Sequence, residues 1–447
     1  MRRALAITSL VLVAGFFLAG AFAQKSAGPI GDGTRDDTAA LQALVDRGGL
    51  VQLARGTYRI TSPITVDLEK TGFTAIEGGT VARIVMAGAG PAIRFVGQHE
   101  GTAAPKSVKP LVWNRERMPS VDGVEIVGDH AEADGIEASG TMFLTLTRVN
   151  VRDCRHGIRL VKRNRNVIIS DSHIYQNRGI GIFLDGVNLH QINVTGSHVS
   201  YNADGGIVVR GGEVRNLHIT GCDIEANHGQ DSPPTANVFV DSRGGSHAEV
   251  AITGNTIQHT HDAPGSANIR IQGPSIPSSV TDERRDGHVT ITGNILSDVH
   301  TNIHLDHARA VVVTGNTMWT AYSLNMLVEN SSNVVVGPNA LDRNPRYGRE
   351  ESPTTTNAVV FRNCSDCTVT GLHVTGTRAA PAGVTLEKCD RFHFANCTIL
   401  DCNPVGLLLK DVTRSRIAGC LIRDDRPNAM SVPVKVEGGS DNTVDWK

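Results

Sequence analysis

Residues 250–271 read Val-Ala-Ile-Thr-Gly-Asn-Thr-Ile-Gln-His-Thr-His-Asp-Ala-Pro-Gly-Ser-Ala-Asn-Ile-Arg-Ile and contain two signals that recur along the chain. The first signal is an alternating apolar run that ends in Thr-Gly-Asn and resumes with Ile257. The second is a Gly or Asn, here Asn268, directly before another alternating apolar run. Each repeat therefore carries three short strands in which every second side chain is buried. Three strands per repeat predict a coil of triangular cross-section.

The second signal aligns the repeats with one another. It occurs as Gly135, Gly157, Gly181, Gly206, Asn237, Asn268, Asn302, Asn325, Gly383 and Gly406. The last inward residues of the strands that follow it are Ala138, Leu160, Leu184, Val209, Val240, Ile271, Leu305, Val328, Phe361, Leu386, Leu409 and Val436. Most of these residues follow one another at intervals of about 22 to 34 residues, as in solenoid repeats. The pattern predicts an all-β, single-stranded parallel β-helix of about 12 coils, with loops of different length at two of its three corners.

The third corner is the Thr-Gly-Asn turn. Asn tolerates left-handed backbone geometry, and its amide can bond to the next Asn one strand spacing away, about 4.8 Å along the axis. We therefore expect a ladder of stacked amides made of Asn255, Asn294, Asn316 and Asn339.

Composition agrees with a repetitive β protein and excludes one class of partner. Gly supplies 47 of 447 residues and aromatic residues only 4%. A single solenoid is favoured over several domains because each coil packs only on its neighbours. The formal net charge is −2 and Lys and Arg are dispersed. A nucleic-acid partner is not expected, because it would require a concentrated basic face.

The first 23 residues are typical of a secretory signal. Arg2 and Arg3 precede the apolar stretch 4–22, and Ala21-Phe22-Ala23 forms a small-x-small cleavage site. The mature chain is expected to begin near Gln24 and to be secreted, periplasmic or displayed at the cell surface, without membrane attachment after cleavage. A retained membrane anchor is the alternative, because the apolar run is marginally long enough to span a bilayer.

The segment after the signal predicts a cap for the N-terminal end of the solenoid. An Asp at the start of Asp36-Asp37-Thr38 is expected to cap a helix, because helical apolar spacing follows at Leu41, Leu44 and Val45. Residues 24–120 would hold this cap and the first coils, and residues 121–447 the remaining repeats.

The same segment carries a family resemblance. Gly31-Asp32-Gly33 with Asp36-Asp37-Thr38, followed by Gly49-Leu-Val-Gln-Leu-Ala-Arg-Gly-Thr-Tyr58, resembles the N-terminal motif of the pectate-lyase superfamily. The resemblance implies a right-handed parallel β-helix and a carbohydrate substrate or ligand, since the superfamily includes polygalacturonases, lyases, epimerases and phage tailspikes. The chain lacks Gly-His-Gly, Arg-Ile-Lys and Asn-Thr-Asp, so hydrolysis of the polygalacturonase type is not expected.

The strands that follow the Gly or Asn signal resemble the substrate face of that superfamily, and their outward residues form two columns. The first outward column is Glu137, Arg159, Phe183, Val208, Phe239, Arg270, His304, Leu327, Val360, Thr385, Leu408 and Lys435. The second outward column is Ser139, Val161, Asp185, Arg210, Asp241, Gln272, Asp306, Glu329, Arg362, Glu387, Lys410 and Glu437. The second column alternates in sign over much of its length, which is typical of a ladder of exposed ion pairs.

Asp306 and Glu329 break this alternation. Two carboxylates on neighbouring coils disfavour joint ionisation or recruit a cation. The ionisable residues expected around them are Arg270, His304, Asp241, His300 and His307. The candidate substrate-binding residues are Asp185, Arg210, Asp241, Arg243, His300 and His307. Long insertions at residues 227–236, 273–287 and 338–356 flank these coils, and long loops on a rigid scaffold are often functional.

The cluster fits proton abstraction from an acidic sugar. A polysaccharide lyase or epimerase needs a base that removes the proton α to a uronate carboxylate and a cation that stabilises the enolate-like charge. His304 is the candidate base and Arg270 the candidate cation. Asp306 would orient His304 or, together with Glu329, hold a Ca²⁺.

Two alternative functions fit the same residues. Asp306 and Glu329 would be the acid and base of a glycoside hydrolase, with a spacing nearer to that of retaining enzymes. A non-catalytic cell-surface or matrix β-helix that binds glycan or protein would leave His304 as a solvated surface residue. We expect a monomeric, exported, polysaccharide-active protein with lyase-like or epimerase-like action on an acidic glycan.

Four cysteines fall into stacked pairs in the repeat alignment. Cys397 and Cys420 occupy the position of the asparagine ladder in consecutive coils, and Cys364 and Cys389 each follow an inward residue by three positions. Adjacent-strand spacing is compatible with a disulfide, so proximity is expected for both pairs and their oxidation state is left open.

Overall fold

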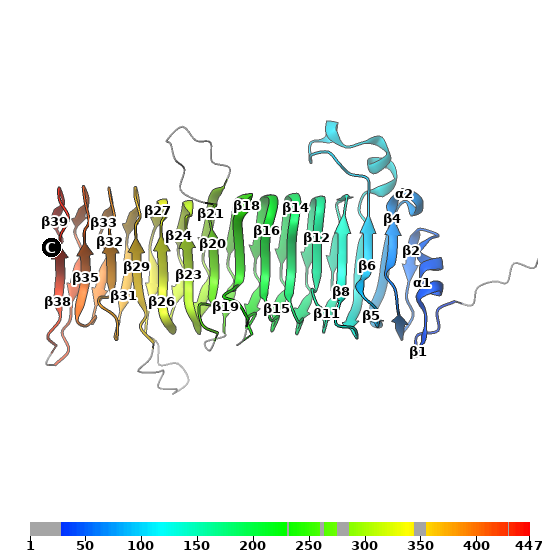
Figure 1. Cartoon of the computed structure of the whole chain (residues 1–447), viewed down its shortest axis with the longest axis horizontal. Coiled ribbons are helices and arrows are strands. Elements are labelled where there is room, and N and C mark those ends of the chain that lie inside the picture. Colours follow the sequence, from blue (N-terminus) through cyan, green and yellow to red (C-terminus); the bar gives the residue numbers. More distant parts are fainter. Residues whose placement is uncertain (1–27, 230–231, 260–262, 275–285, 344–354, 428) are drawn as a thin grey trace, which may run out of the picture.

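A computed structural model of the chain describes residues 28–229, 232–259, 263–274, 286–343, 355–427 and 429–447. These residues form one long parallel β-helix in which 39 strands belong to a single continuous sheet (Figure 1). The expected signal segment, residues 1–23, lies outside the described residues. The coils stack along one axis and give the molecule an elongated shape, as the three-strand repeat predicts.

Strand pairing divides the sheet into three faces, which we call the first, second and third. The first face contains β4 (Ile64–Asp67), β6 (Gly90–Val96), β8 (Ala133–Ser139), β20 (Ala267–Gln272), β23 (Val299–Asp306), β26 (Ala321–Glu329), β29 (Ala358–Arg362), β32 (Val384–Glu387), β35 (Val405–Lys410) and β38 (Val432–Glu437). Four long strands begin on the first face and turn onto the second, namely β12 (Ile158–Ser170), β14 (Ile180–Thr195), β16 (Gly205–Thr220) and β18 (Ala236–Thr253).

The other strands complete the second and third faces. The second face adds β2 (Gly49–Gln52), β9 (Thr141–Met142), β10 (Thr145–Thr147), β21 (Gly287–Thr292), β24 (Arg309–Thr314), β27 (Ser332–Val336), β30 (Thr368–Thr370), β33 (His393–Ala395), β36 (Arg416–Ala418) and β39 (Thr443–Asp445). Two strands run from the second face onto the third, namely β5 (Thr74–Met86) and β7 (Ser120–Gly128). The third face adds β1 (Asp32–Asp36), β3 (Gly56–Ile60), β11 (Asn150–Arg152), β13 (His173–Tyr175), β15 (His198–Ser200), β17 (Asp223–Glu225), β19 (Thr256–Gln258), β22 (Ile295–Ser297), β25 (Thr317–Met318), β28 (Asn339–Leu341), β31 (Leu372–Thr375), β34 (Thr398–Leu400) and β37 (Leu421–Arg423).

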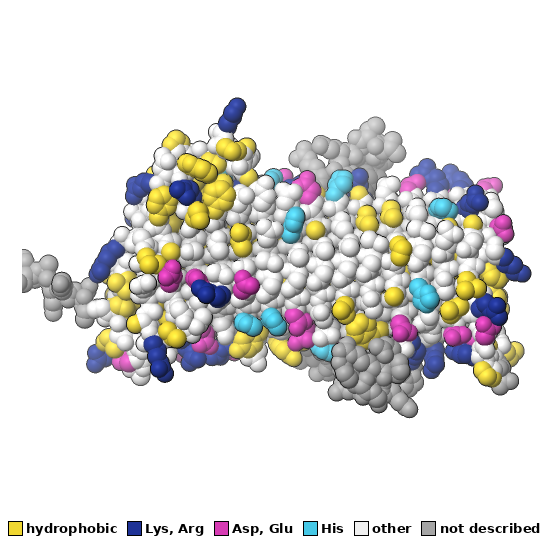
Figure 2. Space-filling model, turned by 180° about the vertical axis from the view of Figure 1, so that it is seen from behind, with side chains coloured by type: hydrophobic (Ala, Val, Ile, Leu, Met, Phe, Trp, Pro, Cys, Tyr) yellow, Lys and Arg dark blue, Asp and Glu magenta, His cyan; other side chains and the backbone are white. Residues whose placement is uncertain are grey.

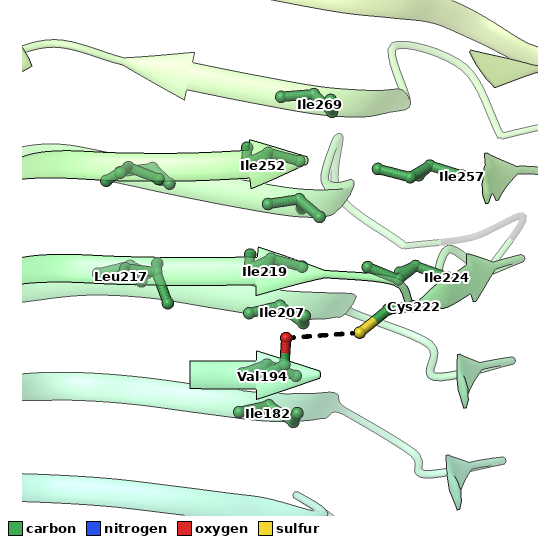
Figure 3. Close-up of a cluster of buried hydrophobic side chains, with 14 of the residues drawn as sticks. Ile182, Val194, Ile207, Leu217, Ile219, Cys222, Ile224, Ile252, Ile257 and Ile269 are labelled. Carbon is green, nitrogen blue, oxygen red and sulfur yellow. Dashed lines mark hydrogen bonds between the residues drawn. The ribbon is translucent and has the colours of Figure 1, made fainter. Parts of the chain in front are cut away.

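The inward column pairs in the predicted register along its whole length. Leu184 lies opposite Leu160 on one side and Val209 on the other, and the same pairing continues to Val436 in the last coil. Figure 3 shows how such stacked aliphatic side chains fill the interior, with Ile252, Ile219 and Val194 in successive coils. Val436, in the last coil of the described residues, is 52% exposed, whereas the earlier members of the column are buried.

The predicted asparagine ladder is present at the corner between the second and third faces. The Nδ2 atom of Asn255 donates to Oδ1 of Asn294 at 3.0 Å, and the same bond links Asn294 to Asn316 and Asn316 to Asn339. Each Oδ1 also accepts the backbone N–H of the preceding asparagine. All four side chains are buried, so the ladder satisfies backbone and side-chain polar groups that water cannot reach.

A second amide ladder explains why the aligning position is Gly in some coils and Asn in others. In the earlier coils the amide comes from an Asn at the corner before the first face, and this amide leaves no room for a side chain at the aligning position. A Cβ on Gly206, for example, would lie 2.8 Å from Asn227 Nδ2 and 2.5 Å from Asn237 O. From Asn237 onward the aligning residue itself supplies the amide. The ladder is continuous, with Nδ2 to Oδ1 distances of 2.7–2.8 Å, through Asn177, Asn202, Asn227, Asn237, Asn268, Asn302 and Asn325.

The N-terminal helix is present, but its capping differs from the prediction. Helix α1 (Thr38–Val45) buries Leu41 and Val45 against the first coils. The side chain of Asp37, at the N-cap, makes no capping bond to the helix and instead accepts the backbone N–H groups of Ile30 and Gly31 at 2.7 and 2.9 Å. Asp37 therefore ties the segment before β1 to the cap.

Three short helical segments lie between the early strands. They are α2 (Leu68–Thr71), the 3₁₀ helix η1 (Pro105–Ser107) and the π helix η2 (Val112–Glu116). The two η segments belong to residues 97–119, an insertion that projects from the side of the helix near its N-terminal end (Figure 1).

The outward columns keep the predicted register, but part of the first outward column is buried. Arg270 pairs with Phe239 and His304, and Gln272 with Asp241 and Asp306. Phe183, Val208 and Phe239 were expected on an open groove. They instead form a small buried cluster with Ile180, Ala236 and Ala267, which lie at the starts of strands on the same face.

Candidate functional site

His304 and Glu329 form the centre of the ionisable cluster on the first face. Strand β23 presents His304, and β26 presents Glu329 one coil later, with His304 Nε2 3.0 Å from Glu329 Oε1. Burial of His304, together with the positive charge of Arg270, lowers the pKa of its imidazole, and the hydrogen bond to Glu329 opposes that shift only in part. His304 is therefore mainly neutral at neutral pH, as a general base must be.

Glu329 also lies close to a cation that the sequence-based prediction did not include in the site. Arg362 on β29 places Nη1 3.5 Å from Glu329 Oε2, while its Nε bonds to Glu387 at 3.0 Å. Arg362 stands directly after Glu329 in the second outward column. Its place in that column is the sequence feature that could have assigned Arg362 to the site. The alternating charges of the column instead predicted that Arg362 belongs to a ladder of exposed ion pairs.

Asp306 lies opposite Glu329 in the predicted register, and it has partners of its own. Burial would raise the pKa of its carboxyl group, but hydrogen bonds from Asn330 and Gln272 and the nearby His307 outweigh burial and lower that pKa. Asn330 Nδ2 donates at 2.9 Å, and His307 Nδ1 lies 2.7 Å from Oδ1. The two carboxylates on neighbouring coils therefore have separate partners.

Arg270 is adjacent to His304 but is held chiefly by the backbone. Its two terminal nitrogens donate to the carbonyl oxygens of Pro234 and Gly265, and its guanidinium lies 5.6 Å from the centre of the Phe239 ring. Burial lowers the pKa of Arg270, and so does the nearby Arg243. The positive charge beside His304 is thus fixed in position rather than carried on a mobile side chain.

Asp241 anchors the next pair of cations on the face. Arg243 Nη2 bonds to Asp241 Oδ2 at 2.7 Å, and Arg210 Nε lies 3.9 Å from the same oxygen. Burial would raise the pKa of Asp241, but the hydrogen bonds and charge of Arg243 lower it. Arg243 remains 60% exposed, so its free donors face solvent beside the His304 cluster.

Two residues of the predicted site lie apart from this cluster. Asp185 is bonded by Arg159 Nε at 2.9 Å, and Arg159 also reaches Glu137 at 3.2 Å, so these three residues form a separate network. His300, at the start of β23, has a pKa lowered by burial and shares no hydrogen bond or ion pair with His304 or Asp306.

Two buried histidines support the cluster and were not predicted. His228 Nε2 lies 3.1 Å from the carbonyl oxygen of Ala267, three residues before Arg270. His247 Nε2 lies 2.9 Å from the carbonyl oxygen of Asp241. Burial lowers the pKa of each histidine to about 4. Neither histidine belongs to an outward column, so the alternation of side chains along the strands did not predict that they lie near the cluster.

These buried histidines predict acid lability. Their folded pKa values of about 4 lie below the ordinary value of 6.5, so the unfolded chain binds protons first as the pH falls. The free energy of unfolding is therefore expected to decrease between about pH 6.5 and pH 4, by on the order of 3 kcal/mol for each histidine.

The substitution His228→Gln tests this expectation by denaturant unfolding at several pH values. Gln retains an N–H donor for the Ala267 carbonyl but does not titrate, so the pH dependence of stability is expected to become shallower. The matched control is His393→Gln, which alters an exposed histidine of the second face. An unchanged pH dependence in His228→Gln would contradict the expectation.

A groove continues from the cluster toward the C-terminal end of the first face. It has a volume of about 760 Å³, and its floor contains Val360, Thr385 and Leu408 of the first outward column. One edge is the charged ladder Arg362, Glu387, Lys410 and Glu437, and the other edge contains Leu324, Ala382, Val405 and Met430. An extended chain lying in this groove would run along the helix axis past Glu329.

The described residues do not assemble a recognisable metal centre. Across the described ranges, no group of three or more His, Cys, Asp and Glu side chains is placed to hold a metal ion. Asp306 and Glu329 supply at most four carboxylate oxygens, and both are engaged by the partners named above, whereas Ca²⁺ takes six to eight oxygen ligands.

The stacked cysteines contact each other in both pairs. The thiols of Cys364 and Cys389 lie close enough to shift each other's pKa, and so do those of Cys397 and Cys420. Each of the four thiols donates to the backbone carbonyl two residues before it. All eight cysteines of the chain are buried free thiols.

The basic segment at residues 152–165 is largely paired rather than free. Arg152 bonds to Glu125 at 3.0 Å and Arg155 to Asp134 at 2.6 Å. Thr260, His261 and Asp262 lie outside the described residues, as do the central parts of the three long insertions.

Two family models match overlapping parts of the chain. A model for right-handed β-helix regions matches residues 114–257, and a model described as periplasmic copper-binding protein (NosD) matches residues 242–444. The donor sets in the described residues do not fit a copper centre of three or more His, Cys, Asp or Glu ligands. No curated protein matches the sequence.

Solved structures resemble the chain over most of its length. The A-module of the mannuronan C-5 epimerase AlgE4 from Azotobacter vinelandii is 14% identical, with a TM-score of 0.54, and the match covers 93% of this chain and 98% of that module. A tailspike mutant of the E. coli bacteriophage HK620 is 12% identical, with a TM-score of 0.54 and coverage of 94% and 78%. Another mutant of that tailspike, in complex with a pentasaccharide, has a TM-score of 0.51 with the same identity and coverage.

These findings define the class of the protein. The chain is a right-handed parallel β-helix protein, as its coil pattern and its N-terminal motif predict. At identities of 12–14% the likeness to solved structures establishes the fold alone. Among the described residues no helix is long and apolar enough to cross a membrane.

Proposed function

We propose that the protein is an exported polysaccharide-active enzyme that acts on an acidic glycan by abstracting a proton from a uronate residue, as a lyase or an epimerase does. The hydrogen-bonded pair of His304 and Glu329 beside the fixed charge of Arg270 carries this proposal. The pair lies at one end of a groove along the helix axis, and export is supported by the match to a family model described as periplasmic.

His304 would act as the general base. The Glu329 carboxylate accepts the Nε2–H bond, which leaves Nδ1 as the unprotonated nitrogen of the neutral ring. Because burial lowers the pKa of the ring, His304 is ready to accept a proton at neutral pH. The proton α to the sugar carboxylate would move to the imidazole, and Glu329 would stabilise the imidazolium that forms.

Arg270 and its neighbours would stabilise the negative charge on the substrate. The guanidinium of Arg270 is fixed by two backbone carbonyls, so its charge does not have to be reoriented during the reaction. Arg243 and Arg362 keep exposed donors on either side of His304 and would pair with the carboxylates of neighbouring uronates.

The groove would hold the rest of the chain. Its edge carries Arg362 and Lys410, and its apolar floor fits the C–H faces of sugar rings. Asp306, held by Asn330 and His307, would orient the substrate beside His304. The described parts of residues 24–120 and 121–447 would act as one solenoid, with the first part closing its N-terminal end.

A non-catalytic glycan-binding β-helix is the second candidate, because many charged residues of this face are paired with one another. Glu387, for example, bonds to both Arg362 and Lys410 at 3.0 and 2.9 Å. Such a ladder would recognise a charged chain without reacting with it.

One experiment separates the candidates. The mature protein is incubated with mannuronan, alginate, pectate and neutral glycans, with and without Ca²⁺, and the products are followed by absorbance of unsaturated sugars and by proton exchange from solvent ²H₂O. Unsaturated products support a lyase, and deuterium incorporation without cleavage supports an epimerase. Binding of an acidic glycan without either product would overturn the enzymatic proposal and favour the binding module. Reducing ends without unsaturation would favour a hydrolase.

A further inference from the structure

A separate pocket lies on the second face, at the base of the insertion formed by residues 97–119. It has a volume of about 360 Å³, within the range of roughly 300–1,000 Å³ that is typical of small-molecule sites. Its lining residues are Met118, Phe143, Thr145, Asn166, Val167, Ile168, Gln191 and Asn193. Figure 2 shows hydrophobic side chains gathered on the surface near this end of the molecule. The pocket lies around a corner from the His304 cluster, which occupies the first face.

The chemistry of the lining is apolar and uncharged. Four side chains are hydrophobic, three carry amides and one carries a hydroxyl group, and none of the eight ionises near neutral pH. An ion would therefore find no partner of opposite charge, whereas a ligand with an apolar surface and hydroxyl groups would find both kinds of contact.

The amides are placed by the coil repeat. Thr145, Ile168 and Asn193 face one another in consecutive coils, so they are spaced at about 4.8 Å along the helix axis. Asn166 Oδ1 is buried and has no hydrogen-bond partner among the described residues. That oxygen is covered by protein, so the amides open to a ligand are those of Gln191 and Asn193, which are exposed.

Aromatic side chains give the pocket a rigid edge. The rings of Phe143 and Trp113 meet edge to face, with centroids 6.0 Å apart. The Arg117 guanidinium lies 5.7 Å from the Trp113 ring centre and 5.2 Å from that of Phe73, and its Nε bonds to the Trp113 carbonyl. Trp113 and Met118 nevertheless stay 48% and 60% exposed, so the edge is fixed but open to a ligand.

We infer that this pocket binds a neutral sugar unit of a glycan. The C–H face of a pyranose would pack on Phe143, Met118 and Ile168, and its hydroxyl groups would bond to the exposed amides of Gln191 and Asn193. A uronate is disfavoured because none of the eight lining residues is a cation, and the nearby Arg117 is already held by the Trp113 carbonyl and lies over the Phe73 and Trp113 rings. The inference is independent of the proposed function, since it uses neither the residues nor the face of the His304 cluster.

The test measures binding of neutral hexasaccharides (cellohexaose, mannohexaose and chitohexaose) and of hexamannuronate to the full mature chain by isothermal titration calorimetry. At least one neutral hexasaccharide is expected to bind. The substitution Ile168→Asp, which adds a carboxylate to the pocket, is expected to weaken that binding at least tenfold. The matched control is Val312→Asp, which lies in the same outward column of the second face as Ile168. The two side chains are similarly exposed, at 38% for Val312 and 40% for Ile168.

A second variant keeps the inference testable if Ile168→Asp fails to fold. Asn193→Ala removes one exposed amide from the lining and is expected to weaken neutral-sugar binding at least tenfold, while His304→Ala leaves it unchanged. The inference is overturned if no neutral hexasaccharide binds, if Val312→Asp weakens binding as much as Ile168→Asp, or if the native chain sediments as a dimer that Ile168→Asp converts to a monomer.

Discussion

Replacing His304 with Ala is expected to lower kcat by about 10²–10⁴-fold, the usual contribution of a general base. The substrate for this measurement is a uronate glycan that the native protein converts. KM is expected to change little, because the carboxylates of the substrate would be bound by Arg243, Arg362 and Lys410. The native activity should fall as the pH drops below the ordinary histidine range, since burial lowers the pKa of His304.

The control for this prediction is His393→Ala, which removes an exposed histidine from the second face. Glu329→Gln provides a graded comparison, because the amide still accepts the Nε2–H bond but carries no charge to stabilise the imidazolium. Its loss of kcat is expected to be smaller than that of His304→Ala. Equal kcat in native protein and His304→Ala would contradict the assignment of the base.

Replacing Asn294 with Ala is expected to produce the largest loss of stability of any single polar substitution considered. The side chain makes four bonds, to Ile252 O, to Asn316 Oδ1 and from both nitrogens of Asn255, at 2.9–3.0 Å. Asn255 N would be left buried without a bond, whereas Asn255 Nδ2 keeps its bond to Ile219 O and Asn316 Oδ1 keeps the backbone N–H of residue 294. The loss of four bonds at about 0.5–1.5 kcal/mol each should therefore lower the free energy of unfolding by about 2–6 kcal/mol. Urea unfolding and amide hydrogen exchange of the adjacent coils measure this loss.

Asn294→Ser provides the graded comparison for this ladder. In earlier coils Ser197 occupies the equivalent corner, where its Oγ accepts the backbone N–H of Ser172 at 3.2 Å. A serine at position 294 is thus expected to keep the bond from Asn255 N and to cost less than alanine. Thr290→Ala, on an exposed site of the same coil, is expected to change stability by less than about 0.5 kcal/mol. If Asn294→Ala were no more destabilising than Thr290→Ala, the ladder would have no role in stability.

The candidate site was predictable in part, for reasons visible in individual residues. His304, Arg270, Asp306 and Glu329 came together because their register follows from the coil repeat alone. The repeat also placed Asp185 on this face, but Arg159 engages it in a separate network. A long side chain such as Arg159 can reach several charged residues, and its distances to them decide which one it bonds. The alternation along a strand predicts the face on which a side chain lies but not these distances.

The sequence by itself determined the coil repeat, the register of its columns and the Thr-Gly-Asn ladder. A side-chain period of two and an anchor residue in every coil leave one alignment in which all the apolar residues point inward. The sequence also showed that the aligning position changes from Gly to Asn at Asn237.

Only the tertiary structure decided what that change means and how open the first face is. The amide of Asn227 fills the space beside Gly206, so glycine is required there, whereas Asn237 supplies the next amide itself. Likewise, Phe183 and Phe239 point outward yet are buried in a cluster at the strand starts. The need for glycine at Gly206 and the burial of the two phenylalanines both depend on contacts between residues of different coils. These neighbours set the volume available to a side chain, whereas its own position in the repeat does not.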